Sequence, residues 1–259
     1  MELTLYQIDA FANRTFEGNP AAICPLDKWL SDELMQSIAT ENNLSETAFF
    51  VQSDTGYHIR WFTPAHEVDL CGHATLASAY VIFNILGHKE NEIQFESKSG
   101  VLTVKQDHDW LAMNFPSQPP VKCETPQQII NAFDETPIEC LKSEDYIVVF
   151  ENEQSVLDAK PNLAVLSELY LRGVAITSVS NKYDFITRFF APKYGINEDP
   201  VTGSAFTQLI PYWANKLNKS SLSAKQVSKR GGEVACIYSG DRVQISGKAV
   251  KYMVGTIEI

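Results

Sequence analysis

Arg60-Trp-Phe-Thr-Pro64, followed by Asp69-Leu-Cys-Gly-His-Ala74, is nearly repeated later in the chain as Arg188-Phe-Phe-Ala-Pro192 and Asp199-Pro-Val-Thr-Gly-Ser-Ala205. The two arginines are 128 positions apart and the two Gly-x-Ala triplets are 131 apart, close to half of the 259 residues. Solenoid repeats are shorter, at roughly 20–50 residues. The long period therefore predicts two related lobes, with a cleft between them that receives one copy of each motif.

Each half of the chain is predicted to contain several strands and one apolar helix. The first half includes a strand over residues 57–62 and a helix that Ser31 caps, and the second includes a helix from Asn162 to Leu171. The first helix is expected over residues 72–86 and the second over 203–216, so each begins at a Gly-x-Ala triplet. A helix with so few polar positions is typical of a buried helix. The sequence therefore predicts an α+β fold of two barrel-like lobes, each with strands wrapped around a central helix.

The best linker candidate is Pro116–Pro120, with the sequence Pro-Ser-Gln-Pro-Pro. We therefore expect an N-terminal lobe of residues 1–116 and a C-terminal lobe of residues 117–259. This division allows for the chain end to cross back to the first lobe.

Composition excludes several classes of function. The net charge of −11 argues against general affinity for nucleic acid or an anionic membrane, which need clustered Lys and Arg. No stretch approaches the roughly 20 apolar residues of a membrane span, and the first residues lack the features of a secretion signal. The five cysteines form no C-x-x-C pair, so we expect no metal site and reduced thiols in the cytoplasm.

The start of each expected helix suits a negatively charged ligand. The first turn of a helix has unpaired N–H donors and a positive dipole end, and Gly72 and Gly203 allow close approach to the backbone. Two such ends could bind a carboxylate and its developing charge. The alternative is that both glycines only permit tight packing, and the pattern alone does not separate the two interpretations.

Five blocks are distinctive in combination: Gly18-Asn-Pro-Ala-Ala22, Asn43-Leu-Ser-Glu-Thr-Ala-Phe-Phe50, Arg60-Trp-Phe-Thr-Pro64, Asp69-Leu-Cys-Gly-His-Ala-Thr75 and Glu198-Asp-Pro-Val-Thr-Gly-Ser-Ala205. In this order they resemble the phenazine-biosynthesis PhzF-like family. The resemblance implies the fold of diaminopimelate epimerase, with two pseudo-symmetric lobes, each a barrel-like and mostly antiparallel sheet around a central helix. It also implies an active site between the lobes.

The resemblance implies a cofactor-independent isomerase that acts on a small carboxylate. In the family's characterised member, the glutamate of the Ser-Glu-Thr motif moves a proton on a cyclohexadiene carboxylate, and here that residue is Glu46. Such a base needs a pKa near the working pH, which partial burial would provide. His73 and Asp199 match polar residues that hold substrate or relay protons. The expected substrate-binding residues are Asn19, Ser45, Gly72, Ala74, Gly203, Ser204 and Ala205.

Each of these assignments has a simpler alternative. An isolated Ser-Glu-Thr is usually a surface strand, and Asp199 before Pro200 or Asn19 before Pro20 could be turn formers. Arg60 and Arg188 are expected to make ion pairs that support the fold, and Arg230 lies in an expected late turn. Many relatives continue the second motif with histidine where this chain has Phe206, which casts doubt on any substrate assigned by analogy.

Cys71 supports a second hypothesis. Related epimerases and proline racemases use one cysteine at this point of each lobe, but the second lobe here offers Thr202, whose hydroxyl is too weak an acid to replace a thiol. A symmetric two-thiol racemase is therefore excluded, whereas a Cys71-dependent lyase or dehydratase is not. The alternative for Cys71 is a buried apolar role.

A third hypothesis is a non-catalytic ligand-binding protein with the same fold. The expected partner in every case is a small carboxylate, without nucleic acid or membrane, and family resemblance favours a homodimer. The sequence does not identify the substrate.

Overall fold

The computed structural model describes all residues, 1–259, and the chain forms two compact units. Unit 1 comprises Met1–Asn114 and Ser246–Ile259, and unit 2 comprises Phe115–Ile245. The chain leaves unit 1 in strand β8 (Trp110–Pro116) and returns in β17 (Arg242–Gly247). Residues 246–259 belong to unit 1, because β18 pairs with β1. Our division into residues 1–116 and 117–259 counted them with the second lobe but allowed the chain end to cross back.

Unit 1 is built on a mixed, mostly antiparallel sheet in the order β18-β1-β2-β3-β4-β6-β7-β8, with the short β5 beside β4. Only the β2–β3 and β4–β6 pairs are parallel. The remaining strands are β1 (Glu2–Ala10), β2 (Asn19–Leu26), β3 (Glu46–Gln52), β4 (Tyr57–Phe62), β5 (Glu67–Val68), β6 (Glu92–Ser97), β7 (Gly100–Asp107) and β18 (Ala249–Glu258).

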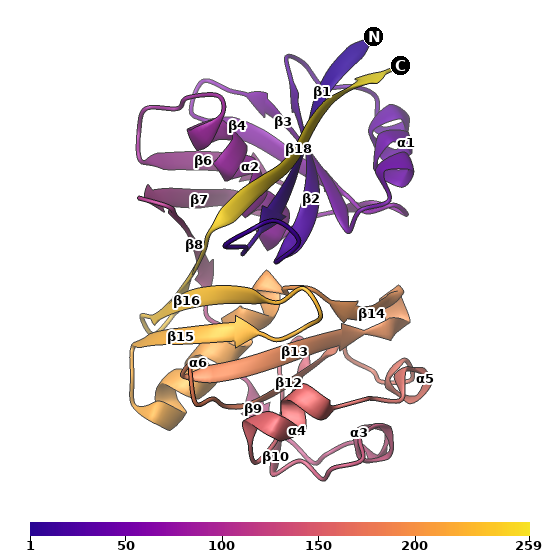
Figure 1. The fold of residues 1–259 in the computed structure, drawn as a ribbon, viewed down its shortest axis with the longest axis vertical. Helices are drawn as coiled ribbons and strands as arrows, with labels where there is room; N and C mark the ends of the chain where they lie inside the picture. The colour runs from indigo at the N-terminus through magenta and orange to yellow at the C-terminus, as the bar shows by residue number, and fades with distance from the viewer. The chain divides into compact units, whose positions relative to one another are not determined.

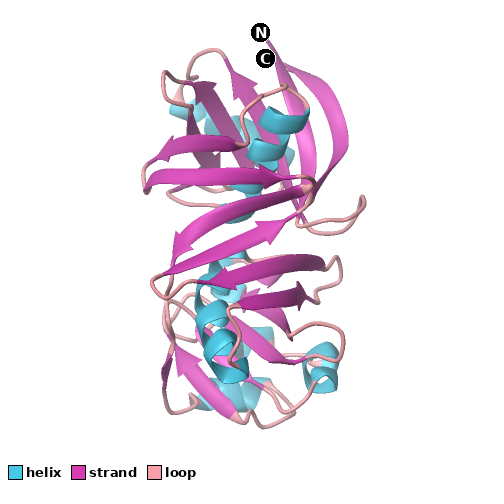
Figure 2. Cartoon of the chain, turned by 90° about the vertical axis from the view of Figure 1, so that its left-hand side faces the viewer, coloured by secondary structure: helices cyan, strands magenta, loops and turns pink.

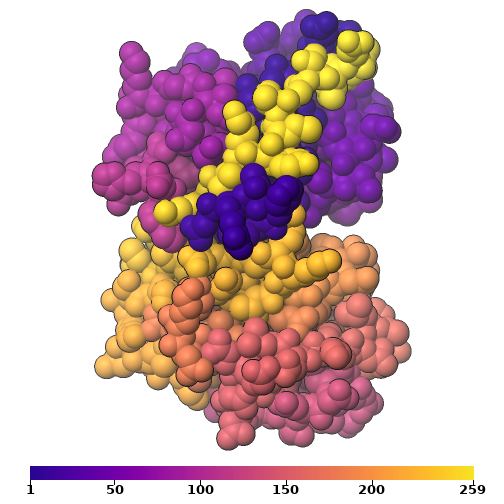
Figure 3. All heavy atoms as spheres, viewed as in Figure 1, coloured from indigo at the N-terminus to yellow at the C-terminus, as the bar shows by residue number.

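The final strand lies along the first one. β18 pairs antiparallel with β1 from Glu2↔Glu258 to Ala10↔Ala249, and the two chain ends lie close together (Figure 1). The terminal amino group of Met1 donates to the carbonyl of Ile259. Residues 251–254 of β18 are exposed, and in the space-filling view the strand is visible along its length (Figure 3).

Helix α2 (Gly72–Asn84) is the buried centre of unit 1, as its composition predicts. Ten of its thirteen residues are buried, and it packs against β1, β2 and β3. The hydroxyls of Thr75 and Ser78 donate to the carbonyls of Cys71 and Ala74, so these polar groups are satisfied within the helix. Helix α1 (Asp32–Asn42) begins as expected, with the Ser31 side chain accepting from the Leu34 N–H.

Unit 2 repeats the strand order of unit 1. β9 (Val121–Lys122), β10 (Glu139–Lys142) and β11 (Tyr146–Val149) pair antiparallel, β11 pairs parallel with β12 (Val174–Val179), and β12 pairs antiparallel with β13 (Phe185–Ala191). β13 pairs parallel with β15 (Ser221–Gln226), which pairs antiparallel with β16 (Gly232–Tyr238), and the short β14 (Ile196–Asp199) lies beside β13. The internal repeat therefore extends from two motifs to whole units.

The central helix of unit 2 is α6 (Phe206–Leu217), preceded by one 3₁₀ turn, η2 (Gly203–Ala205). It packs against β15 and β16, and the Trp213 Nε1–H donates to the Thr177 hydroxyl of β12. The smaller helices are α3 (Gln127–Ala132), α4 (Glu153–Asp158), α5 (Leu163–Leu166) and the 3₁₀ turn η1 (Pro192–Tyr194). Strands predominate over helices in both units (Figure 2).

Several elements differ from the sequence-based expectation. The helix expected from Asn162 to Leu171 ends at Leu166, although Asn162 caps it by accepting from the Val165 N–H. Strands β10, β14 and β15 and helix α4 were not predicted, because their short sequences are rich in polar residues. None of the helices has the length and hydropathy needed to cross a membrane.

The repeated arginines form equivalent ion pairs in the two units. Arg60 binds both carboxylate oxygens of Glu67 at 2.7 and 2.9 Å, and Arg188 binds both of Glu198 at 2.7 and 3.1 Å. The Arg60 guanidinium holds the pKa of Glu67 down to about 2. Each guanidinium also lies 5.1 Å from the ring centroid of the aromatic residue two positions later. These arginines join the β4–β5 and β13–β14 hairpins, as expected.

Replacing Arg188 by Gln should lower the free energy of unfolding by about 2 kcal/mol, because it leaves Glu198 partly buried without its bidentate partner. The change also removes guanidinium bonds to the carbonyls of Val156 and Ala159. Urea denaturation measures the effect. The control is Lys105→Gln, which breaks an exposed ion pair with Glu92 and should cost less than about 1 kcal/mol. Equal losses would contradict a structural role for the Arg188 pair.

Candidate functional site

Three residues that the sequence motifs identified, Glu46, Cys71 and His73, lie together in unit 1 at the starts of β3 and α2. Glu46 is the first residue of β3, opposite Ala21 of the parallel strand β2. Cys71 is the N-cap residue of α2, and His73 lies in the first turn. Because α2 packs against both β2 and β3, residues from positions 46 and 71–73 meet although they are far apart in sequence.

The His73 ring lies between a carboxyl group and a thiol. Its Nε2 is 3.2 Å from Glu46 Oε2, although the angles fall outside those of a good hydrogen bond. Its Nδ1 is 3.5 Å from Cys71 Sγ. The side chains of His73 and Glu46 are 8% and 17% exposed, respectively. The cluster is therefore mostly shielded from water, where hydrogen bonds and charges act strongly.

Burial keeps His73 neutral. Removal from water lowers the pKa of His73 from an ordinary 6.5 to about 4. A neutral imidazole carries one N–H donor and one acceptor lone pair. With the proton on Nε2, the ring can donate toward the Glu46 carboxylate while Nδ1 accepts from the Cys71 S–H. The arrangement can therefore hold or pass a proton between a carboxyl group and a thiol without creating a buried cation.

The turn before β2 positions Asn19 and Ser45. Gly18 has φ +65°, and a Cβ there would lie 2.0 Å from the Ala10 carbonyl oxygen, so the turn requires glycine. Asn19 is fully buried, and the Ser45 hydroxyl donates to Asn19 Oδ1 at 3.4 Å. Asn19 and Ser45 are thereby linked across the starts of neighbouring strands, next to Glu46.

In unit 2, hydrogen bonds fix the loop that carries Asp199. The Thr202 hydroxyl donates to Asp199 Oδ2 at 2.5 Å. Gln226 accepts from the Thr202 N–H at 2.8 Å and donates to the Asp199 carbonyl at 2.7 Å. Thr202 thus supports a carboxylate. Gln226 was missed by the sequence analysis, because a lone glutamine in a polar strand gives no signal.

The remaining predicted residues of unit 2 lie at the start of its central helix. Gly203, Ser204 and Ala205 form η2, and Gly203 and Ala205 are buried while Ser204 is partly exposed. Phe206 is fully buried, and its ring centroid lies 6.1 Å from that of Phe185. Arg230 follows β15 in a turn where Ser228 donates to the Pro200 carbonyl and accepts from the Gly231 N–H.

The structure thus assigns the predicted residues to two sets. Glu46 and His73 lie in unit 1 with Asn19, Ser45, Gly72 and Ala74, of which Asn19 and Ala74 are fully buried. Asp199 lies in unit 2 with Gly203, Ser204 and Ala205.

Glu46, Cys71 and His73 could also hold a metal ion. One ligand atom from each lies within 4.8 Å of the others, and carboxylate oxygen, thiolate sulfur and imidazole nitrogen are all zinc ligands. A bound ion would occupy the lone pairs that acid/base chemistry uses, so the two roles exclude each other at this cluster. Our sequence-based expectation is no metal, and chelation distinguishes the two.

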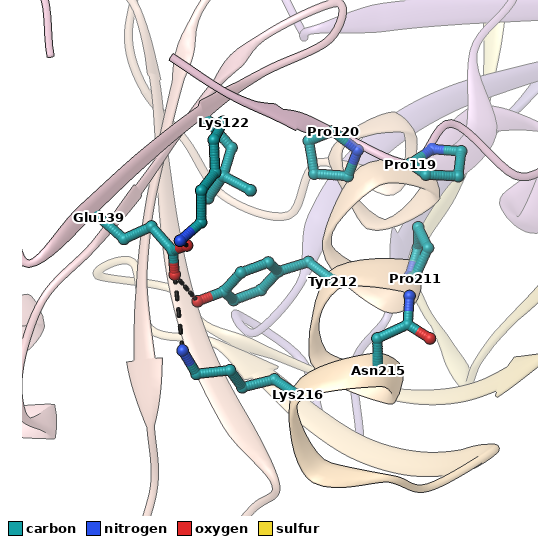
Figure 4. A pocket seen from close by; sticks show the side chains of 9 residues that line it. Pro119, Pro120, Lys122, Glu139, Pro211, Tyr212, Asn215 and Lys216 are labelled. Carbon is teal, nitrogen blue, oxygen red and sulfur yellow. Dashed lines mark hydrogen bonds and ion pairs between the residues drawn. The ribbon is translucent and has the colours of Figure 1, made fainter. Parts of the chain in front are cut away.

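A separate pocket of about 400 Å³ lies in unit 2 (Figure 4). Its charged side chains are mutually paired: Glu139 contacts Lys122 at 2.7 Å and Lys216 at 3.6 Å and accepts from the Tyr212 hydroxyl at 2.7 Å. None of its lining residues belongs to the predicted site. The pocket therefore adds no candidate for the chemistry.

Comparison with known proteins identifies the family. Residues 8–255 match the family model of phenazine biosynthesis-like proteins. The chain belongs to this family. It is 51% identical over 259 residues to an uncharacterized isomerase of Pseudomonas aeruginosa, with full coverage of both chains. Family membership and the names of such relatives support an isomerase function.

Solved structures confirm the predicted fold class. A PhzF-family protein from Enterococcus faecalis is 43% identical and superposes with a TM-score of 0.98 over the whole of both chains. A predicted epimerase from Pseudomonas aeruginosa, 18% identical, has a TM-score of 0.78 and covers 98% of this chain and 99% of its own. The second likeness shows the fold alone. The chain therefore has the α+β, diaminopimelate epimerase-like fold.

We expect His73 to stay neutral down to about pH 4. The unfolded chain would bind a proton near pH 6.5 and the folded chain only near 4, so this residue's contribution to stability is present above pH 6.5. It is lost between pH 6.5 and 4, at about 1.4 kcal/mol per pH unit. The free energy of unfolding of the wild type and of His73→Gln, measured by urea denaturation between pH 6.5 and 4, should fall less steeply with decreasing pH in the variant. Imidazole NMR showing a charged His73 at pH 7 would instead indicate that an ionised Glu46 outweighs burial.

Proposed function

We propose that the chain is a cofactor-independent isomerase that moves a proton on a small carboxylate substrate, with Glu46 as general acid and base. The observation that carries this proposal is the 3.2 Å approach of Glu46 Oε2 to His73 Nε2 in a mostly buried cluster. A carboxyl group in such a position has a proton-transfer partner beside it and little competing water. The family's isomerases support the reaction class.

In the proposed reaction, Glu46 takes a proton from an activated carbon and returns it to another carbon of the same substrate. The C–H bonding electrons delocalise into the substrate's conjugated system and then form the new C–H bond, so no external oxidant or reductant is needed. The neutral His73 ring, with Nε2 3.2 Å from Glu46 Oε2, is proposed to stabilise the ionised Glu46 by directing its N–H dipole toward the carboxylate. General acid/base catalysis by one group typically contributes roughly 100- to 10,000-fold.

The proposed substrate carboxylate binds at main-chain N–H groups of a helix start. Cys71 caps α2 without a side-chain hydrogen bond to its first turn, and the N-terminus of a long helix favours anions. In unit 2, Ser204 and Asp199 are proposed to contribute to substrate binding, with Thr202 and Gln226 holding Asp199. A cytoplasmic location and a homodimer are also part of the proposal.

Replacing Glu46 by Gln should keep the shape of the cluster and remove the base. Carboxylate metabolites that raise the melting temperature of the protein are incubated with it in D₂O, and hydrogen exchange is followed by mass spectrometry. We expect Glu46→Gln to slow exchange at least about 100-fold. Glu96→Gln, which changes a partly exposed carboxyl on β6, serves as the control. Full exchange by Glu46→Gln would overturn the assignment, and loss of exchange after EDTA would indicate a metal enzyme.

A second candidate is a lyase or dehydratase that uses Cys71 as its acid/base group. The 3.5 Å contact between Cys71 Sγ and His73 Nδ1 favours it, because a base within reach can take the thiol proton. The hydroxyl of Thr202 donates to Asp199 and is no equivalent of this thiol in unit 2. Such an enzyme would release water or another group instead of returning the proton.

Iodoacetamide distinguishes the two candidates. If Cys71 is the working group, its alkylation should proceed in parallel with loss of activity, and His73→Gln should slow the alkylation several-fold by removing the neighbouring base. Peptide mapping separates Cys71 from the other four cysteines. If the Cys71→Ala variant exchanges deuterium at the normal rate, Cys71 is not the acid/base group and Glu46 remains the candidate.

A further inference from the structure

Two thiols of unit 2 touch each other away from the candidate site. The Sγ atoms of Cys123 and Cys140 are 3.7 Å apart. The Cys123 N–H donates to the Cys140 carbonyl at 3.0 Å. Because β9 and β10 pair antiparallel with Lys122 opposite Leu141, Cys123 and Cys140 occupy the next opposed positions.

This placement suits a disulfide without backbone rearrangement. Opposed residues of an antiparallel pair have Cα atoms about 4.5–5.5 Å apart, within the range of about 4.4–6.8 Å that disulfides span. The sulfur atoms need to close from 3.7 Å to about 2.05 Å. Rotation of the two side chains about their Cα–Cβ bonds can supply that movement.

The two thiols differ in access. Cys123 is partly exposed, whereas Cys140 is 4% exposed within the hydrophobic cluster of unit 2 and packs there with residues such as Val148 and Phe150. Cys24 and Cys236 are fully buried or nearly so. A dissolved reagent therefore reaches Cys123 first, and Cys140 is placed to react with the product.

We propose that Cys123 and Cys140 form a reversible disulfide on exposure to a small-molecule disulfide such as oxidised glutathione. The Cys123 thiolate attacks one sulfur of the reagent, forms a mixed disulfide and releases one glutathione thiolate. The Cys140 thiolate then attacks the Cys123 sulfur, forms the protein disulfide and releases the second glutathione. Two electrons pass from the protein to the reagent, and the two thiol protons go to the released glutathiones.

The bond closes a ring of residues 123–140 that includes helix α3. Cross-linking two segments that are already adjacent stabilises the fold by restricting the unfolded chain. Burial raises the pKa of Cys140 to about 12, and the neighbouring Cys123 thiol adds to the effect. The second step is therefore slow at neutral pH, and a test is best run at about pH 8.5.

The test incubates the full chain with oxidised glutathione, blocks remaining thiols with N-ethylmaleimide and maps tryptic peptides. Cys123 and Cys140 share the peptide of residues 123–142, since no Lys or Arg lies between Lys122 and Lys142. We expect this peptide to lose two hydrogens and to escape the maleimide, while the other three cysteines are blocked after unfolding. Dithiothreitol should restore the thiols, and the oxidised form should melt on the order of 5 °C higher.

Single variants test the order of events. Cys140→Ser should stop at glutathione attached to Cys123, and Cys123→Ser should leave Cys140 reduced. If the buried Cys140→Ser change prevents folding, the peptide map of the oxidised wild-type protein still tests the proposal. The proposal is overturned if wild type keeps glutathione on Cys123, remains fully reduced, links another pair of cysteines, or melts at a lower temperature once linked. None of these outcomes depends on the isomerase reaction.

Discussion

The burial of helix α2 is the constraint on which unit 1 depends. A helix with mostly apolar side chains is stable in water only when other elements cover most of its surface, and here β1, β2 and β3 supply that cover. The enclosed helix must still begin somewhere, and its first turn carries main-chain donors and the His73 ring. The polar cluster of Glu46, Cys71 and His73 is therefore a consequence of how the core is built.

Unit 2 uses the same framework with different residues at the start of its central helix. Its strand order matches that of unit 1, and the Arg188–Glu198 pair is equivalent to Arg60–Glu67. At the helix start, however, the residue before the Gly-x-Ala triplet is a threonine that donates to a carboxylate, instead of a thiol beside an imidazole. The framework repeats because it serves packing, whereas under the proposed function the residues at the helix starts differ because they act on the substrate.

The sequence predicted the α+β fold class and the elements with strong periodicity. Strand β4 has the predicted bounds and helix α1 has the predicted N-cap, because local apolar spacing determines the first and a capping residue the second. Strand β15 was missed because a pattern such as Ser-Leu-Ser-Ala-Lys-Gln has only two apolar side chains, Leu222 and Ala224. Its pairing with β13 and β16 is a tertiary effect that local sequence does not contain.

For the site, the motifs identified residues but not their contacts. Glu46 and His73 were singled out separately, and only the packing of α2 on β3 brings them within 3.2 Å. The contact between Cys71 and His73 depends on side-chain rotation within a helix cap, and the role of Gln226 depends on hydrogen bonds to a loop 24 residues earlier in the chain. These are three-dimensional facts without a local signature.

The return of β18 to β1 also determines when each unit can be completed during synthesis. Unit 2 is one continuous segment, whereas unit 1 needs the last residues of the chain for its edge strand. A ribosome therefore finishes unit 2 while β1 still lacks β18 beside it, and unit 1 closes only after β18 has been synthesised. The part of the protein made first is the part that is finished last.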